Sequence, residues 1–403
     1  MKKVAPIVLF VYNRLKHTKK TIQSLQKNYL AKQSDIYIYS DGGKDEESWA
    51  EVYKIRKYLK TISGFRKITF IKRNENIGLS KNIIDGVTTI INEYGKIIVL
   101  EDDIVTSPYF LNFMNDSLDF YEQESKVWHI SGWNYPISSE NLKDTFLWRT
   151  MNCWGWATWK DRWGHYEKNP KELISIFNHN DISRFNLDDS TNFWEQVKSN
   201  HDKKMNTWAI FWYAIIFKNN GLCLNPTQSF TENIGFDGTG TNTGYRNNYS
   251  NNLSRQKYNI EFEHELKENK TATDRIKLFF REQENKNLSF SKNLNKIFNL
   301  LSKLKIENKK YILYGSGTGM DLVSSFLKEK NIEFIIDNDL KKHNSTKNGI
   351  KIIGLTYFKD YDSDNHNIII TVFGRASKII ETLVNEYQIS KDRLISLDIF
   401  ETN

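Results

Sequence analysis

The sequence has few of the features that mark a secreted or membrane-spanning protein. Among its 403 residues are two cysteines, Cys153 and Cys223, too few for a disulfide framework and without the spacing of a metal site. No apolar run approaches the roughly 20 residues that a membrane-spanning helix needs. Residues 1–6 lead directly into an apolar strand and lack the pattern of a signal peptide. We therefore expect a cytoplasmic protein, with a peripheral place on the inner face of the membrane left open.

Net charge and aromatic content indicate which kinds of ligand the protein can bind. The net charge is +8, but the basic residues are scattered and arginine is not interleaved with aromatics. This pattern fits an anionic ligand or surface and argues against a protein that reads nucleic acid. The tryptophans crowd into residues 128–212. They predict either the wall of a pocket or an ordinary aromatic core.

The first 110 residues alternate strands and helices. The apolar runs predict strands, and the stretches between them have helical spacing. Strands are expected at 7–11, 36–40, 68–71 and 97–100, with helices at 17–26, 46–61 and 80–92. This order predicts an α/β fold with a mostly parallel sheet and right-handed crossovers.

The rest of the chain divides into three parts. Residues 111–245 predict helices and loops beside the edge of the first sheet. Residues 246–308 are a polar connector, and 309–403 restart the α/β pattern as a smaller domain. The domains predicted are thus 1–245, 246–308 and 309–403.

The connector contains one amphipathic stretch with lysines on its polar side. Such a helix can lie on an anionic membrane surface or pack against a neighbouring domain, and the spacing favours packing. Its apolar positions are Phe290, Leu294, Ile297, Phe298, Leu301 and Leu304.

Three consecutive acids, Glu101-Asp102-Asp103, follow the apolar run 97–100. Carboxylates at the carboxyl end of a buried strand lie where open α/β sheets bind ligands. Hard oxygen ligands suit Mg²⁺ or Mn²⁺, which often bridge to a substrate's phosphates. Alternation along a strand predicts that Glu101 and Asp103 share a face and that Asp102 points away. The alternative is an acidic turn that caps the next helix.

Other polar residues cluster at the ends of neighbouring strands. Asp41 follows the second strand, and Asn76, Ser80 and Asn82 follow the third. A nucleotide sugar needs acceptors for its base and ribose, polar groups for its sugar, and a cation for its diphosphate. We expect these side chains to supply the first two requirements and Asp103 to hold the cation.

Seven motifs together resemble the GT-A fold glycosyltransferases, most closely the bacterial surface-polysaccharide enzymes related to the N-acetylglucosaminyltransferase I type. The likeness covers about residues 4–280. The motifs are Pro6–Arg14, Asp41-Gly42, Asn76–Ser80, Glu101–Asp103, Cys153–Trp159, Trp208–Trp212 and Asn233–Gly240.

The resemblance implies a metal-dependent hexosyl transfer, with inversion at the sugar carbon. It implies a nucleotide-sugar donor, with a UDP-sugar favoured, Mn²⁺ or Mg²⁺ as cofactor, and a glycan or lipid-linked saccharide as acceptor in polysaccharide synthesis. Residues 1–110 would be the nucleotide-binding half and residues 111–245 the acceptor half.

The resemblance also implies individual roles. Asp103, with Glu101 beside it, would hold the metal. Asp102 would contact ribose or sugar, and the loop around Asp237 would close over the donor. Donor contacts would come from Asn13, Arg14, Asp41, Asn76, Ser80, Asn82, Trp154, Gly155 and Trp156.

The segment that carries the catalytic base in animal relatives has a different sequence here. Animal relatives carry an aspartate in a W-D-D-W segment, whereas Trp208–Trp212 holds no acid here. An inverting transfer needs a base within reach of the acceptor hydroxyl. Asp237 is the first candidate and Asp161 the second. Asp161 also fits a surface ion pair with its neighbours.

The C-terminal motifs Tyr314–Gly319 and Phe334–Asp339 resemble the Rossmann-like module of bacterial sugar-acyltransferases. The resemblance implies a fold and no activity. Asp337 stands where a ribose hydroxyl can be held, but the spacing of the glycines departs from the dinucleotide fingerprint. A scaffold or a contact between copies of the chain is an equal expectation.

Two other functions fit part of the pattern. A non-catalytic scaffold that binds sugar nucleotides would explain the missing acid of the Trp208–Trp212 segment. A sugar-phosphate nucleotidyltransferase would need a basic glycine-rich turn after the first strand, and Val11–Leu15 does not supply one.

Overall fold

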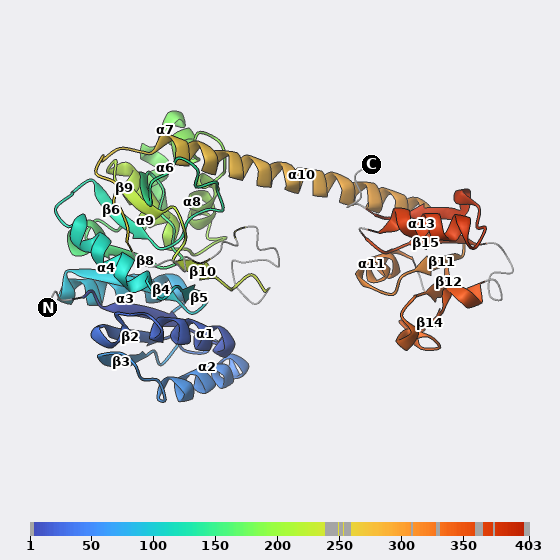
Figure 1. Ribbon diagram of the computed structural model, residues 1–403, viewed down its shortest axis with the longest axis horizontal. Helices are drawn as coiled ribbons and strands as arrows, with labels where there is room; N and C mark the ends of the chain where they lie inside the picture. The colour runs from blue at the N-terminus through green and yellow to red at the C-terminus, as the bar shows by residue number, and fades with distance from the viewer. Residues whose placement is uncertain are drawn as a thin grey trace. The chain divides into compact units, whose positions relative to one another are not determined.

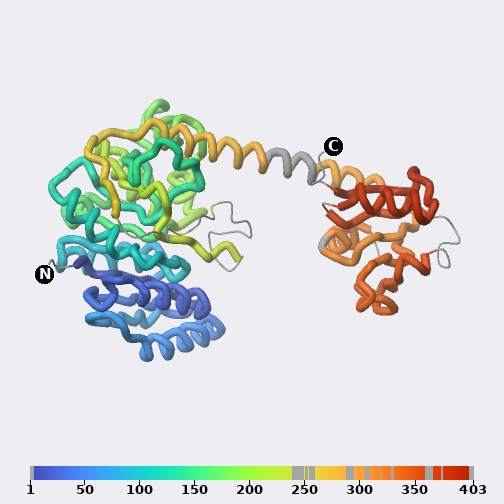
Figure 2. The backbone as a smooth tube through the Cα atoms, in the orientation of Figure 1, coloured from blue at the N-terminus to red at the C-terminus, as the bar shows by residue number. Residues whose placement is uncertain are grey.

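The computed structural model describes residues 4–237, 249, 253, 259–307, 309–327, 331–358, 366–373 and 375–398 (Figures 1 and 2). The chain forms two compact units, residues 1–283 and 284–403. The division falls inside the predicted connector, whose limits at 245 and 308 stay predictions.

Unit 1 is built on an eight-stranded mixed sheet of order β3-β2-β1-β4-β8-β6-β9-β7. Its first four strands are parallel, so their carboxyl ends meet at one edge. β8 runs antiparallel to β4. The strands are β1 (Ile7–Val11), β2 (Asp35–Ser40), β3 (Lys67–Lys72), β4 (Lys96–Glu101), β6 (Val127–Ser131), β7 (Thr145–Trp148), β8 (Trp156–Trp159) and β9 (Leu222–Pro226). The predicted α/β fold is confirmed.

Helices cover both faces of the parallel strands. The α1 helix (Leu15–Gln26) and α2 (Glu46–Leu59) contribute to one core, and α3 (Leu79–Tyr94) contributes to the other. Gly86 lets α3 approach the sheet closely, because a Cβ there would lie 2.7 Å from the Phe10 ring. All three helices match the predicted ones to within a few residues at each end.

The second half of unit 1 contributes β6 to β9 to the main sheet, so the prediction of helices and loops beside the sheet edge for residues 111–245 is wrong. These strands are only four or five residues long and mix polar residues with tryptophans, so no apolar run marks them.

The same half of unit 1 also adds short helices and a small two-stranded sheet. β5 (Ile104–Thr106) pairs antiparallel with β10 (Thr231–Asn233). The helices are α4 (Phe110–Phe120), α5 (Lys160–Trp163), α6 (Pro170–Ile176), α7 (His179–Phe185), α8 (Trp194–His201) and α9 (Ala209–Lys218). The tryptophans of residues 128–212 are buried, apart from half-buried Trp154. Most of this aromatic content is therefore core.

His129 lies inside that core and is neutral. The Trp212 indole N–H donates to its Nδ1 over 3.2 Å, and its Nε2 is 3.0 Å from the Asn152 carbonyl. Indole is only a donor, so Nδ1 must accept and Nε2 must carry the hydrogen. Burial lowers the pKa of His129 to about 3, against the opposing effect of the Asn152 carbonyl. The imidazole thus ties the start of the Asn152–Trp156 segment to α9.

Unit 2 has a six-stranded sheet of order β13-β14-β12-β11-β15-β16, parallel except for β13. Its strands are β11 (Tyr311–Tyr314), β12 (Ile332–Ile336), β13 (Thr346–Lys347), β14 (Ile350–Ile353), β15 (Asn367–Ile370) and β16 (Leu394–Ser396). Helices α11 (Thr318–Phe326) and α13 (Ala376–Asn385) accompany them. This is the second α/β domain that the sequence predicted.

Asp337 ends β12 and faces the glycine turn after β11. Its Oδ2 accepts hydrogen bonds from the Ser316 backbone N–H, at 3.0 Å, and from the Ser316 hydroxyl. Lys342 Nζ lies 3.3 Å from the same oxygen. The carboxylate that a ribose would need is therefore engaged within the turn.

The long helix α10 (Lys270–Glu307) contributes to the cores of both units. Ala272 and Ile276 belong to a core of unit 1, while Ile297, Leu301 and Leu304 belong to a core of unit 2. For those three positions the packing interpretation of the amphipathic stretch is confirmed. The side chains of residues 290 and 294 lie outside the described ones. Among the helices that the structure describes, none is long and apolar enough to cross a membrane.

The neutral, buried His129 predicts a pH dependence of stability. An unfolded histidine takes up a proton below its ordinary pKa of 6.5, whereas the folded one resists protonation until about pH 3. Stability from this group is therefore full above pH 6.5 and is lost on acidification, by up to about 1.4 kcal/mol per pH unit.

Urea unfolding followed by tryptophan emission reports unit 1 alone, because all tryptophans lie at or before residue 212. His129→Gln should be less stable at pH 7 but should lose less stability between pH 7 and pH 5 than the natural chain. Equal losses in the two proteins would contradict this account of His129.

Candidate functional site

The acids at the end of β4 meet an arginine from the loop between β1 and α1. Arg14 Nη2 donates to Asp103 Oδ2 over 2.8 Å and also to Asp102 Oδ1. We call Arg14, Glu101, Asp102 and Asp103 the acidic corner. The prediction that Asp102 points away from Asp103 is wrong, because β4 ends at Glu101 and the two aspartates form a turn, where strand alternation no longer applies.

The sheet and α1 hold the acidic corner in place. β1 and β4 are parallel neighbours, with Phe10 opposite Glu101, so the next residues of both strands emerge side by side. The Thr21 hydroxyl on α1 donates to the Asp102 carbonyl over 2.8 Å. Asn13 precedes Arg14 and is half-buried. The corner is therefore fixed by three separate elements.

Negative charge exceeds positive charge in the acidic corner. Burial, and then the charges of Asp103 and Asp102, raise the pKa of Glu101 to about 8. Burial also raises the pKa of Asp102 to about 6, although Arg14 opposes that rise. The two aspartates in turn raise the pKa of Arg14 against the lowering effect of burial. Two aspartates share one guanidinium and Glu101 lies close to them, so a further cation would be stabilised here.

The residues present fit a divalent cation that also binds substrate oxygens. The ligands are hard carboxylate oxygens, and Asp102 Oδ2 is buried without a hydrogen-bond partner in the described part of the chain. No cluster of three or more His, Cys, Asp or Glu side chains among the described residues could hold a metal by itself. Mg²⁺ and Mn²⁺ commonly take one or two carboxylates and complete their coordination with water and phosphate.

The segment 233–237 closes over the acidic corner. The Ile234 N–H donates to the Asp103 carbonyl over 2.9 Å. A Cβ at Gly235 would collide with the Asp103 carboxylate and would lie 3.2 Å from Arg14 Nη1, so only glycine fits there without displacing them. Residues 238–244 of the predicted closing loop lie outside the described residues.

Asp237 is the last residue of this segment and pairs with a histidine that sequence reasoning missed. His17 Nε2 lies 3.1 Å from Asp237 Oδ2; the histidine is buried and the aspartate side chain is 47% exposed. Nothing in the sequence pattern links position 17 to position 237, because the contact joins the first turn of α1 to the end of the β10 segment. The pair is a partly exposed carboxylate that a buried histidine contacts.

Trp154, Gly155 and Trp156 are the residues predicted to contact the donor, and they lie in two different environments. Trp154 lies against Trp133, with ring centres 4.5 Å apart, and against Phe236 of the closing segment, at 5.6 Å. Gly155 is buried next to it with φ 77°. Trp156 stacks on Trp208 at 5.2 Å and is fully buried in β8. Trp156 is thus a core residue and does not line a pocket, because its side chain is fully covered by neighbouring aromatic rings.

Asp41 organises the turn before α3. Its carboxylate accepts hydrogen bonds from the backbone N–H groups of Gly42, Ile77 and Gly78 at 2.9 to 3.1 Å, and from the Asn76 amide at 3.3 Å. A carboxylate has about four acceptor positions, and these donors occupy them. Asp41 and Asn76 therefore shape the loop, and a contact of the Asp41 carboxylate with a nucleotide would replace one of these bonds.

Ser80 and Asn82 occupy the first turn of α3 and are buried. Asn82 Oδ1 accepts from Arg73 Nε over 3.1 Å, and Ser80 Oγ accepts from Lys168 Nζ over 3.3 Å. Ser80 and Lys168 also line a pocket of about 410 Å³ along α3. Ser80 and Asn82 thus form hydrogen bonds with Lys168 and Arg73. Within the described residues, neither side chain bonds to the acidic corner.

Asp161 lies at the wrong edge of the sheet for a base. β8 is antiparallel to β4, and Trp159 pairs with Lys96, so α5 begins at the amino end of β4. Asp161 is 70% exposed and pairs with Arg162 at 2.7 Å. The structure therefore supports an ion pair between Asp161 and Arg162, and Asp161 is too far from the acidic corner to act as the base there.

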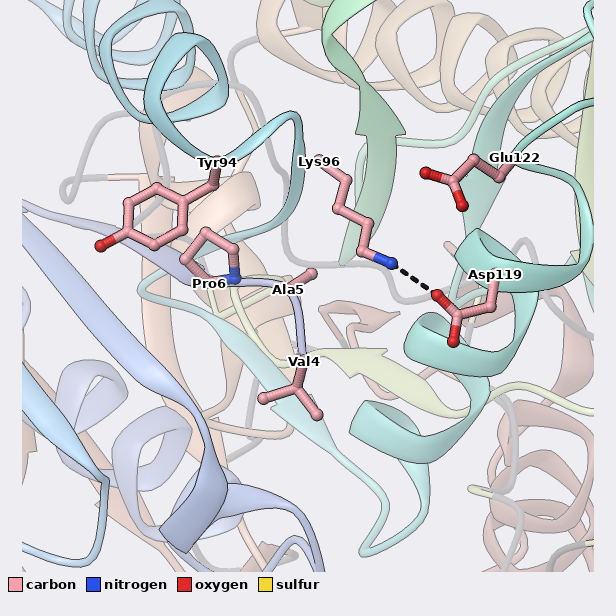
Figure 3. Close-up of a pocket in the computed structure, with 7 residues that line it drawn as sticks. All are labelled: Val4, Ala5, Pro6, Tyr94, Lys96, Asp119 and Glu122. Atoms are coloured by element: carbon pink, nitrogen blue, oxygen red, sulfur yellow. Dashed lines mark hydrogen bonds and ion pairs between the residues drawn. The ribbon is translucent and has the colours of Figure 1, made fainter. Parts of the chain in front are cut away.

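A hollow of about 330 Å³ lies at the same amino edge (Figure 3). It is lined by residues 4–6 before β1 and by Lys96 at the start of β4, whose Nζ pairs with Asp119 at 2.5 Å. The lysine is neutralised within the hollow, and the acidic corner is at the other end of these strands. The hollow is therefore not part of the candidate site.

Comparison with known proteins gives only distant likenesses. No family model matches the chain, and no curated protein matches it. Among solved structures, S. aureus TarS 1-349 is 10% identical over 56% of this chain and 59% of its own, with a TM-score of 0.33. The chain thus spans less than two thirds of that structure.

Two other structures show weaker likeness. The mannosyltransferase PcManGT from Pyrobaculum calidifontis, in complex with GDP-Man and Mn²⁺, is 8% identical over 54% of this chain and 71% of its own, with a TM-score of 0.29. Mouse xyloside xylosyltransferase 1 is 10% identical over 54% and 82%, with a TM-score of 0.28. Likenesses of this size do not show what this chain does.

Gly235 offers a direct test of the closing segment. Gly235→Ala should lower the free energy of unfolding of unit 1 by about 1–3 kcal/mol, because the added Cβ must displace the Asp103 carboxylate. Scanning calorimetry of the whole chain measures this. Gly317→Ala is the control, since a Cβ at Gly317 has no atom within 4 Å. Equal effects of the two substitutions would contradict the close contact at Asp103.

Proposed function

We propose that the protein is a metal-dependent glycosyltransferase that moves a sugar from a nucleotide-diphosphate donor to a glycan or lipid-linked acceptor. The observation that carries this proposal is the acidic corner: two aspartates and an arginine at the carboxyl edge of a parallel sheet. Ligands of open α/β folds bind at that edge. Cation-binding oxygens beside a guanidinium match a diphosphate better than they match an uncharged substrate.

Asp103, with Glu101 close to it, is the proposed metal ligand, and Asp102 is proposed to contact ribose or sugar. A bound Mn²⁺ or Mg²⁺ would neutralise the charge that develops on the leaving diphosphate. Arg14 donates hydrogen bonds from the adjacent strand end and adds a second positive charge on the phosphate side. The Asp41 carboxylate holds the turn at residues 76–78, and the nucleoside would lie against that turn.

Asp237 is the proposed general base. One of its oxygens faces His17 and half of its side chain is exposed, so the carboxylate can accept a proton from an acceptor hydroxyl that approaches from solvent. His17 is the proposed positioning residue that orients the carboxylate. Trp154, next to Phe236, is proposed as the aromatic surface for the sugar.

The finer features rest on the motif resemblance. We propose a UDP-sugar donor, inversion at the sugar carbon and a role in bacterial surface-polysaccharide synthesis in the cytoplasm. A peripheral contact with the inner membrane face and a contact between copies through unit 2 belong to the same proposal. The buried Asp102 and Asp103 support the metal requirement, and the motifs Asn233–Gly240 and Cys153–Trp159 support the class of enzyme.

Asp103→Asn tests the metal ligand with little change of shape. Hydrolysis of a panel of nucleotide sugars with Mn²⁺, without acceptor, should reveal the donor through slow release of sugar. The substitution should lower kcat/KM by about 10²–10³-fold, because the developing charge loses its main stabilisation. Asp161→Asn is the matched control at the opposite edge and should leave the rate unchanged. Full activity in Asp103→Asn would sink the proposal.

Asp237→Asn tests the base separately from donor binding. With an acceptor present, kcat should fall by about 10²–10⁴-fold, while KM for the donor stays within a few-fold of its original value. His17→Gln should cause a smaller fall in kcat and should shift the pH profile. A loss of donor affinity with unchanged kcat would instead make Asp237 a binding residue.

A further inference from the structure

We propose that Arg14 occupies the place of the divalent cation in the donor-free protein, and that a nucleoside diphosphate draws the guanidinium off Asp103 and opens it to the metal. This inference rests on the proposed function and adds to it an order of binding. Its observations are the contacts of Arg14 and the two buried atoms of the acidic corner that lack partners.

The contact of Arg14 differs from an ordinary arginine–aspartate pair. Arg66 binds Asp35 through two nitrogens, Nε and Nη2, at 2.8 and 2.7 Å. This fork is the geometry that guanidinium and carboxylate prefer. Arg14 instead uses the single nitrogen Nη2 for both Asp102 and Asp103. A single nitrogen thus bridges two carboxylates, as a bound cation would.

This bridging contact leaves two buried polar atoms without hydrogen-bond partners among the described residues. They are Arg14 Nη1 and Asp102 Oδ2. Buried polar atoms without partners are uncommon in folded proteins and destabilise them. One of these atoms is a donor that lacks an acceptor, and the other is an acceptor that lacks a cation or donor.

A metal ion together with a nucleoside diphosphate supplies the missing partners. A phosphate oxygen satisfies the Arg14 donor, a cation takes the place of Arg14 on Asp103, and a ribose or sugar hydroxyl can donate to the Asp102 oxygen. Metal alone leaves the Arg14 donor without an acceptor, and the nucleotide alone leaves Asp103 without a cation. The Gly235 backbone closes the corner on the Asp103 Oδ2 side, so the guanidinium and a metal ion cannot both reach that oxygen without crowding.

Electrostatics then couples the two ligands. Two cations on one carboxylate oxygen repel each other, so metal alone must displace Arg14 from its partners without giving it new ones. A diphosphate gives Arg14 new partners and adds ligands for the metal. Metal and diphosphate should therefore each strengthen the binding of the other, by the same factor.

The test measures Mn²⁺ binding to the full chain from the electron paramagnetic resonance signal of the free ion, with and without UDP or GDP. In the natural chain, one of the nucleotides should tighten Mn²⁺ binding by about tenfold or more. In Arg14→Met, Mn²⁺ alone should bind more tightly than to the natural chain, and the nucleotide should add less. Arg66→Met, at the amino edge of the same sheet, should change neither value.

Two further measurements separate this role from a structural one. Arg14→Lys keeps a positive charge and should bind Mn²⁺ alone about as weakly as the natural chain. Mn²⁺ should raise the Tm of Arg14→Met more than that of the natural chain, because bound metal stabilises the folded form. A lowered Tm without this added gain would indicate that Arg14 only stabilises the fold and would overturn the inference.

The outcomes distinguish this inference from the proposed function. If the natural chain binds Mn²⁺ with a nucleotide through Asp103, but Arg14→Met binds Mn²⁺ alone no more tightly, the placeholder role of Arg14 is wrong and the proposed function stands. If neither nucleotide promotes Mn²⁺ binding in any of these proteins, and Asp103→Asn changes nothing, both are wrong.

Discussion

The structure around the candidate site depends on how one buried sheet edge accommodates three carboxylates. Glu101, Asp102 and Asp103 follow the apolar residues 97–100 of β4, and burial raises the pKa of Glu101 and of Asp102. Arg14 compensates part of this charge because β1 and β4 are neighbours in the sheet. The Thr21 bond from α1 and the Gly235 backbone fix the same groups from two other sides.

The same imbalance of charge makes the edge suitable for a cation and an anion together. A metal ion would favour the ionised forms of Glu101 and Asp102, and a diphosphate would accept hydrogen bonds from the guanidinium. The loop that Asp41 holds would form another side of the proposed nucleotide site. The Asp41 carboxylate is bonded within that loop and not to the acidic corner.

Sequence periodicity was sufficient for the first half of unit 1, because its strands contain apolar runs and its helices have regular spacing. It missed β6 to β9, which are short and mix polar residues with tryptophans. Periodicity also placed Asp102 and Asp103 at the carboxyl edge of the sheet, whereas a site role for Arg14 came only from the motif resemblance. The direction of Asp102 was missed, because it depends on where β4 stops and a turn begins.

Other errors came from the antiparallel half of the sheet. Asp161 was assigned to the site although the reversal at β8 carries it to the opposite edge. Trp156 was assigned to the pocket although its strand is internal and fully covered. The His17–Asp237 contact joins segments more than 200 residues apart in sequence, and no local pattern encodes it.

The central claim is that one aspartate at this edge binds a metal ion that also holds a diphosphate. Anomalous diffraction at the manganese edge, from crystals grown with Mn²⁺ and the nucleotide sugar, tests it most directly. The account predicts a single strong peak between the Asp103 carboxylate and the two phosphates, with the Arg14 side chain turned to a phosphate oxygen. A nucleotide bound elsewhere, with no anomalous peak beside Asp103, would contradict it.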